Sequence, residues 1–274
     1  MDKKISSLKQ KYRYSLILLK ELVITEFKLR YQGSALGYLW SVLRPIFLFL
    51  ILYVVFVYFL KIGNDIPHWP VAMLLGIVMW NFFSEVTNNG LASIVNRGDI
   101  LRKINFPKYV IVLSGTISAF INLLINMVVI GVFMAINGVE LTWLALLSPL
   151  YIIELFIFAL GLAFLLSTIY VKLRDINYIW EIIMQGLFYM SAVIYPMSMV
   201  VSMSPLIAKI LLLNPVAQSI QDARYALITQ EMVTLPSLTD NLFINLIPYT
   251  IVLVTFILGA WYFKKKSPTF AENL

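Results

Sequence analysis

Three carboxylates lie within or at the edges of long apolar stretches of the sequence, namely Glu85, Glu154 and Glu181. A charged group is costly in hydrocarbon, so each of these side chains should face protein or water. Such groups can relay protons or contact a polar substrate, or they can be structural groups that hydrogen-bond to neighbours. The surrounding residues leave both interpretations open.

Aromatic side chains offer a second kind of chemistry. They make up 14% of the chain, and several lie deep in apolar stretches: Tyr53, Phe56, Tyr58, Phe188 and Tyr189. Aromatic rings stack on the apolar faces of sugars, and phenol hydroxyls exchange hydrogen bonds with sugar hydroxyls. This mixture suits a sugar conduit, although anchoring at the membrane surface and ordinary packing also explain membrane aromatics.

The chain lacks the residues that several other kinds of chemistry require. The chain has no cysteine and one histidine, His68, which excludes thiolate chemistry and a multi-histidine metal site. It also has no glycine-rich phosphate loop followed by Lys-Ser or Lys-Thr, no nucleophile elbow and no Asp-rich sugar-nucleotide motif. We therefore expect no nucleotide hydrolysis, no metal and no cofactor in this chain.

The composition indicates that lipid surrounds these groups. Of 274 residues, 61% are hydrophobic and 13% are charged, whereas a soluble domain is about a quarter charged. Six apolar stretches are long enough to span a membrane, at about 38–60, 71–94, 109–136, 141–170, 179–201 and 242–263. The fourth is longer than a span needs and should tilt or break near Pro149. The prediction is an all-α integral membrane protein with a single domain, 1–274.

Two further segments are amphipathic. Residues 14–32 predict a helix lying in the cytoplasmic interface, and a short solvated helix is the alternative. Residues 204–235 contain two short apolar stretches separated at Asn214-Pro215. They predict a pair of re-entrant helices in the outer leaflet, with an amphipathic surface hairpin as the alternative.

The basic residues set the expected orientation. Of the 21 Lys and Arg residues, only Lys61, Lys209 and Arg224 fall in segments assigned to the outer side. By the positive-inside rule, both termini should be cytoplasmic. The basic N-terminus lacks a following cleavage site, so no cleavable signal peptide is expected.

Local strings resemble the ABC-2-type permeases of the polysaccharide and polyol-phosphate export family, which export O-antigen, rhamnan, capsule or teichoic acid. The first string is more similar to the O-antigen and rhamnan exporters. The matching strings occur in the family's order: KLRYQGSALGYLWSVLRP (28–45), LRKINFPK (101–108), YVKLRDINYIW (170–180), FYMSAVIYPMS (188–198) and LNPVAQSIQDARYAL (213–227).

The resemblance implies the transmembrane subunit of an ABC exporter in the bacterial cytoplasmic membrane. It would carry a lipid-linked polysaccharide, as a homodimer with two copies of a separate ATP-binding subunit that holds ATP and Mg²⁺. Membrane lipids are the other expected partners, and no nucleic acid is expected. The coupling region would be 96–108, with the loop after residue 172 as a second contact, and 204–235 would form gate helices.

The resemblance also implies site residues. The candidates for the substrate conduit are Tyr53, Phe56, Gln185, Tyr189 and Tyr195. Those for the entrance that binds the lipid pyrophosphate are Lys28, Arg30 and Arg44, and those for coupling to the ATPase are Asp99, Arg102, Lys103, Arg174 and Asp175. Anchoring to anionic headgroups is the alternative role for the basic residues.

Three alternative functions remain open at this point. An ABC-2 permease for a drug or a simple lipid would share the same architecture. A membrane-embedded glycosyl or acyl transferase would use Glu85 or Glu181 as a base and would work without an ATPase subunit. A proton-coupled transporter would lose activity when the proton gradient collapses.

Overall fold

The computed structural model describes residues 2–30, 36–63, 65–103 and 106–273, and the regular secondary structure in these ranges is helical. The longer helices are α1 (Asp2–Arg30), α2 (Trp40–Leu52), α3 (Trp69–Ser93), α5 (Tyr109–Ile136), α6 (Ser148–Lys172), α7 (Ile176–Met190), α10 (Pro215–Leu227) and α12 (Leu242–Lys266). The shorter ones are η1 (Gly37–Leu39), η2 (Tyr53–Phe59), η3 (Val95–Arg97), α4 (Gly98–Lys103), η4 (Trp143–Leu147), α8 (Met197–Met203), α9 (Pro205–Leu212), α11 (Leu235–Leu238), η5 (Ser267–Thr269) and α13 (Phe270–Asn273).

Within the described residues, five helical segments are long and apolar enough to cross a membrane. They are Trp40–Phe59, Trp69–Ser93, Tyr109–Ile136, Trp143–Lys172 and Leu242–Thr269. These segments agree with five of the six predicted stretches to within a few residues at most boundaries. The chain is an all-helical, multi-pass membrane protein.

The predicted fifth stretch, 179–201, is not a continuous helix. Helix α7 ends at Met190, a non-helical turn follows, and α8 begins at Met197. Ala192 adopts a left-handed backbone conformation (φ 48°) just after the end of α7, and Pro196 further disfavours helix in the turn because it restricts the residue before it and has no N–H to donate. The 15 residues of α7 correspond to about 22 Å of helix.

Other boundaries follow local sequence signals. The segment predicted to tilt or break near Pro149 changes from a 3₁₀ helix to an α-helix at Ser148, with Pro149 in the first turn of α6, but Trp143–Lys172 continues as one helical span and does not break there. The predicted separation at Asn214-Pro215 is present, and the Asn214 side chain caps α10 by accepting from the Val216 N–H at 3.1 Å. The N-terminal helix is longer than predicted and begins at Asp2.

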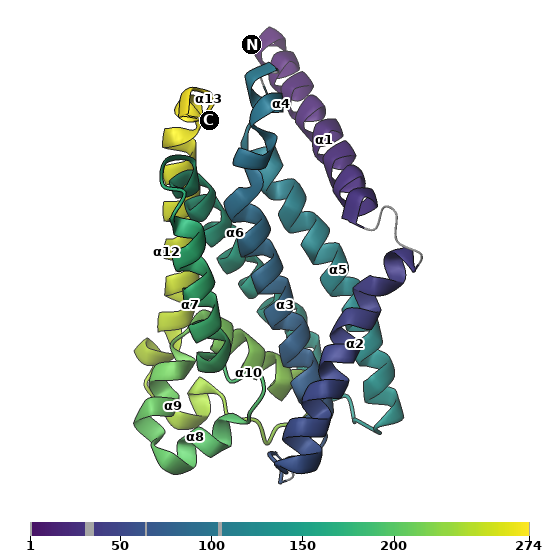
Figure 1. Ribbon diagram of the computed structural model, residues 1–274. Coiled ribbons are helices and arrows are strands. Elements are labelled where there is room, and N and C mark those ends of the chain that lie inside the picture. Colours follow the sequence, from purple (N-terminus) through teal and green to yellow (C-terminus); the bar gives the residue numbers. More distant parts are fainter. Residues whose placement is uncertain (1, 31–35, 64, 104–105, 274) are drawn as a thin grey trace.

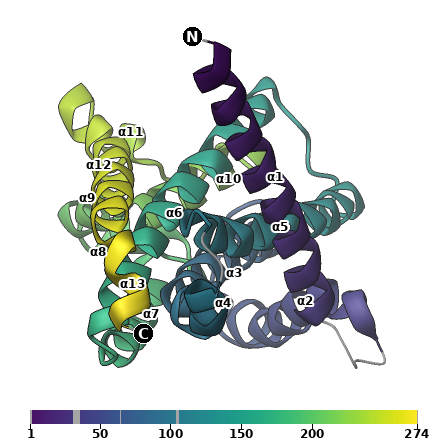
Figure 2. The same ribbon diagram turned by 90° about the horizontal axis from the view of Figure 1, so that it is seen from above.

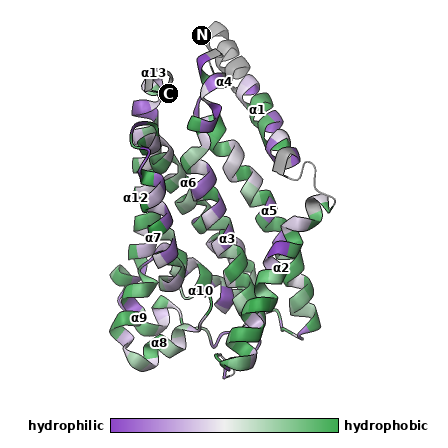
Figure 3. Ribbon diagram, in the orientation of Figure 1, coloured by the Kyte–Doolittle hydropathy of each residue, from purple (hydrophilic) through white to green (hydrophobic). Residues whose placement is uncertain are grey.

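Helix α3 forms the centre of the bundle. It packs against α2, α5, α6, α7 and α10, and Figure 2 shows these helices surrounding it. Both termini lie at one end of the bundle, and α8, α9 and α10 lie at the opposite end (Figure 1). Hydrophobic residues predominate along the bundle, whereas hydrophilic residues interrupt α2 and α3 (Figure 3).

Helices α6 and α12 cross at two glycines. A Cβ atom on Gly259 would lie 2.2 Å from the carbonyl oxygen of Gly161, and a Cβ atom on Gly161 would lie 2.7 Å from the Cα of Phe256. The two backbones therefore touch at this crossing. Such close contact through small residues is typical of helix pairs in membranes.

Helix α1 is attached to the bundle through Glu26. The carboxylate accepts a hydrogen bond from the Arg97 guanidinium and another from the Ser114 hydroxyl at 3.1 Å. Arg97 belongs to η3, directly before α4, so this ion pair joins the N-terminal helix to the start of the predicted coupling region.

We expect Glu26→Gln and Arg97→Gln each to destabilise the folded chain, with an interaction energy between them of about 1 kcal/mol. The pair is only about a fifth exposed, so solvent screens it less than a fully exposed pair. A double-mutant cycle measured by thermal unfolding in detergent tests this. Strictly additive effects of the two substitutions would contradict the predicted contact.

Candidate functional site

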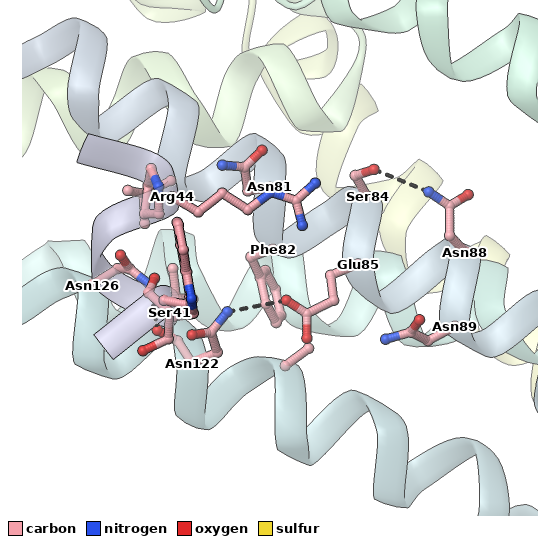
Figure 4. A pocket seen from close by; sticks show the side chains of 15 residues that line it. Ser41, Arg44, Asn81, Phe82, Ser84, Glu85, Asn88, Asn89, Asn122 and Asn126 are labelled. Carbon is pink, nitrogen blue, oxygen red and sulfur yellow. Dashed lines mark hydrogen bonds between the residues drawn. The ribbon is translucent and has the colours of Figure 1, made fainter. Parts of the chain in front are cut away.

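A cavity of about 610 Å³ lies between α2, α3 and α5 (Figure 4). All of its lining residues belong to three of the five candidate spans. They are Trp40, Ser41, Arg44, Pro45, Val78, Asn81, Phe82, Ser84, Glu85, Asn88, Asn89, Ala119, Asn122, Leu123 and Asn126. We call this cavity the polar pocket, because most of these side chains are polar.

Hydrogen bonds hold several of the side chains in place. Asn122 donates to the Glu85 carboxylate at 3.1 Å, and Asn88 donates to the Ser84 hydroxyl at 3.1 Å. Asn126 donates to the Ser41 carbonyl at 3.3 Å. The pocket therefore combines side chains fixed by such contacts with the exposed guanidinium of Arg44.

Helical spacing explains why α3 and α5 line the pocket. Asn81, Glu85 and Asn88 recur at intervals of four and three residues, which places them on one face of α3. Asn122 and Asn126 are four residues apart on α5 and face them (Figure 4). Glu85 and Arg44 were among the residues predicted from the sequence, but the asparagines were not, although their spacing is visible in the sequence.

A second polar feature runs along α7. Asn177, Glu181, Gln185 and Tyr189 follow one another at intervals of four residues, and all four side chains are exposed. We call this row the α7 stripe. Two predicted conduit residues, Gln185 and Tyr189, belong to it, together with Glu181.

The other predicted conduit residues lie around this stripe and on the first span. Tyr195 lies in the turn after α7 and donates its hydroxyl proton to the Tyr189 carbonyl at 2.5 Å. Tyr53 and Phe56 belong to η2; Tyr53 is exposed, whereas Phe56 is partly buried against the core. Helices α2 and α7 flank α3 on the same side of the bundle (Figure 2). The structure thus brings Tyr189 and Tyr195 together and places Tyr53 and Phe56 on a separate helix.

The predicted coupling residues lie at the end of the bundle that carries the termini. Asp99 and Arg102 are exposed in and around α4, and Arg174 and Asp175 are exposed in the turn between α6 and α7. The side chain of Lys103 lies outside the described residues. Arg174 sits over the Tyr170 ring, with 5.1 Å between the guanidinium carbon and the ring centroid.

Lys108, the last residue of the predicted coupling region, binds the C-terminal segment. Its ammonium donates to the carbonyl oxygen of Ser267 at 2.5 Å. Burial lowers the pKa of Lys108, and the negative charge of Glu272 partly opposes this shift.

Two of the three predicted entrance residues can be placed. Lys28 is exposed on α1, and Arg44 is exposed at the polar pocket. The side chain of Arg30 lies outside the described residues. Sequence analysis grouped these three residues, whereas the structure assigns Lys28 and Arg44 to different helices.

Glu154 faces protein, which was one of the two environments expected for it. It is buried in α6 and lies 3.5 Å from the Nε2 atom of Gln218, which also donates to Asp222 at 2.5 Å and to Tyr249 at 3.1 Å. This network joins α6, α10 and α12. Because these side chains hydrogen-bond to one another, the network favours a structural role for Glu154 over a role in proton relay or substrate contact.

Arg224 has a structural role that was not predicted from the sequence, in which it is only a cation on the outer side. This side chain is fully buried, and its guanidinium donates to three backbone carbonyls: Ala72 and Ala192 at 2.8 Å and Val193 at 2.6 Å. It also lies over the Trp69 ring at 5.1 Å. Arg224 therefore joins α10 to the start of α3 and to the turn that follows α7.

Comparison with known proteins identifies the class. Residues 17–228 match the family described as ABC-2 type transporter, and the chain belongs to this family. It is 28% identical over 272 residues to an O-antigen export system permease protein RfbA of Klebsiella pneumoniae, covering 98% of this chain and 100% of that relative. It is 30% identical over 194 residues to the protein of the same name from Myxococcus xanthus, covering 71% of this chain and 74% of that relative.

Proposed function

We propose that this chain is the transmembrane subunit of an ABC exporter that moves a lipid-linked cell-surface polysaccharide across the bacterial cytoplasmic membrane. Its relatives are named O-antigen export permeases, and the match to one of them covers both chains almost completely. The observation that carries the proposal within the structure is the α7 stripe. Polar groups exposed on an apolar helix are costly against lipid, so this face should border a conduit or a second copy of the chain.

The path of the chain supports six crossings with both termini in the cytoplasm. Both termini lie at one end of the bundle (Figure 1), which requires an even number of crossings. With five long spans, α7 and the turn after it supply the sixth. Helices α9 and α10 then act as short gate helices in the outer leaflet.

A homodimer would form the conduit. The aromatic residues of η2, with Tyr189 and Tyr195 near the end of α7, would contact sugars as they pass. Lys28, Arg30 and Arg44 would bind the pyrophosphate of the lipid carrier near the cytoplasmic entrance by charge-assisted hydrogen bonds. Two copies of a separate ATP-binding subunit would hold ATP and Mg²⁺.

Coupling to that subunit would pass through α4 and the turn between α6 and α7. We expect the double variant Asp99→Ala, Arg102→Ala to reduce export about tenfold, while the complex still hydrolyses ATP. Both side chains are exposed, and losing an interface contact between charged groups costs about 1–2 kcal/mol. Export and ATPase rates in proteoliposomes measure this. Glu140→Ala, at an exposed position in the loop between α5 and η4, is the control. Unchanged export by the double variant would place coupling elsewhere.

The proposed function is tested by depletion and reconstitution. Cells depleted of this chain should accumulate lipid-linked glycan, and tagged chain should purify with a phosphate-loop ATPase. Proteoliposomes containing both proteins should then move the glycan only when ATP is present. A chain that purifies without an ATPase, together with unchanged glycan export after depletion, would refute the proposal.

A further inference from the structure

The polar pocket is lined mostly by polar side chains, although it lies within the membrane-spanning helices. All of its lining residues belong to candidate spans, where unpaired polar groups facing lipid are costly. Yet it contains five asparagines together with Ser41, Ser84, Arg44 and Glu85 (Figure 4). The pocket therefore offers a polar environment in which water or a polar ligand can bind.

The balance of charge narrows the choice of ligand. Among the described residues that line the pocket, Arg44 and Glu85 are the only charged ones, and their formal charges cancel. A site for a bare phosphate or diphosphate needs an excess of positive charge and no carboxylate beside it. The pocket fits an uncharged ligand better than an anion.

The types of polar group point to hydroxyls on that ligand. Each asparagine amide offers both N–H donors and a carbonyl acceptor, and the Oδ1 atom of Asn122 is buried without a hydrogen-bond partner among the described residues. Trp40 and Phe82 add aromatic surface to the same lining. Amides, a carboxylate and aromatic rings together match the hydroxyls and apolar faces of a sugar ring.

We infer that the polar pocket binds an uncharged sugar unit of the transported glycan within each protomer, separately from the conduit along α7. A volume of about 610 Å³ lies in the range of small-molecule sites, and the exposed side chains of Arg44, Asn88 and Asn89 leave it accessible. This inference rests on the proposed export function. The sugar next to the carrier would enter the pocket, with the pyrophosphate of the carrier outside it.

Because the chain has no cysteine, single cysteines can test the pocket without background. Ser84→Cys places a thiol in the pocket, and Ser202→Cys, at an exposed position of α8, is the matched control. Both are made in the complex with its ATPase subunit in nanodiscs. Each is labelled with a small charged methanethiosulfonate, with or without oligosaccharide released by mild acid from the host's lipid-linked glycan.

We expect the thiol of Ser84→Cys to be labelled, and oligosaccharide at twice its dissociation constant to slow labelling about threefold. Inorganic pyrophosphate should not slow it, and Ser202→Cys should respond to neither. Adding Asn122→Ala should remove the protection, whereas Asn137→Ala, an exposed asparagine of similar chemistry, should retain it.

Three results would overturn the inference: no labelling of Ser84→Cys, labelling that oligosaccharide does not slow, or protection by pyrophosphate alone. ATP-driven export is measured on the same preparations. Export without protection would refute the sugar pocket and leave the proposed function standing. Absence of export by the unmodified complex would instead refute the function.

Discussion

Replacing Arg224 with methionine is expected to lower the stability of the folded chain by about 2 kcal/mol or more, since it leaves the buried turn carbonyls of Ala192 and Val193 without their donor, at about 1–3 kcal/mol each. The three carbonyls that Arg224 contacts, of Ala72, Ala192 and Val193, come from two separate parts of the chain. Only a planar guanidinium can reach all three at once. The variant should unfold at a markedly lower temperature in detergent.

Two variants make this result specific to the guanidinium. Arg224→Lys should lie between the parent and Arg224→Met, because a single ammonium on a flexible stem cannot reproduce the three-way contact. Lys209→Met removes a partly exposed cation on α9 and should change the unfolding temperature little. If Arg224→Met unfolded at the same temperature as the parent, the proposed link between α10, α3 and α7 would be wrong.

The second large effect is expected at the crossing of α6 and α12. Gly259→Val would force a side chain to within 2.2 Å of the Gly161 carbonyl oxygen, and a backbone atom cannot move aside as a flexible side chain can. Overpacking costs about 1–3 kcal/mol when side chains can shift, so the cost here should be at least that large. We expect little monodisperse protein in size-exclusion chromatography and faster proteolysis before α12.

Gly131→Ala is the matched control for this substitution. It lies on α5, and a Cβ atom there would meet nothing within 4 Å. Alanine also favours helix over glycine by roughly 1 kcal/mol, so this variant should be as stable as the parent or more stable. If Gly259→Val and Gly131→Ala gave the same yield of monodisperse protein and the same rate of proteolysis, the close crossing of α6 and α12 would be contradicted.

The sequence was sufficient to predict five of the six stretches as membrane spans, because hydropathy reports the solvent of each stretch directly. It also located the separation at Asn214-Pro215, where proline chemistry acts locally. The interruption of 179–201 carried the same kind of signal in Pro196, but the apolar residues on both sides obscured it. Local rules therefore account for most of the helix boundaries.

Contacts between distant helices could not be predicted in this way. The spacing of Asn81, Glu85 and Asn88 shows that they share a face of α3, but no local pattern reveals that Asn122 of α5 lies opposite. The three carbonyl partners of Arg224 depend in the same way on the tertiary arrangement. Glu26 and Arg97 are 71 residues apart, and only the packing of α1 on the bundle brings them together.

The position of Arg224 late in the chain has a consequence for biosynthesis. Its partner Ala72 precedes it by 152 residues, so at about 5–20 residues per second the ribosome makes α3 roughly 8–30 s before the guanidinium that pairs with it. The turn after α7 is made only 31–32 residues before Arg224, so its carbonyls must stay solvated or held by the insertion machinery for roughly 2–6 s. The final closure of the bundle at this end is therefore a late event, triggered by the arrival of α10 rather than by the insertion of the spans it joins.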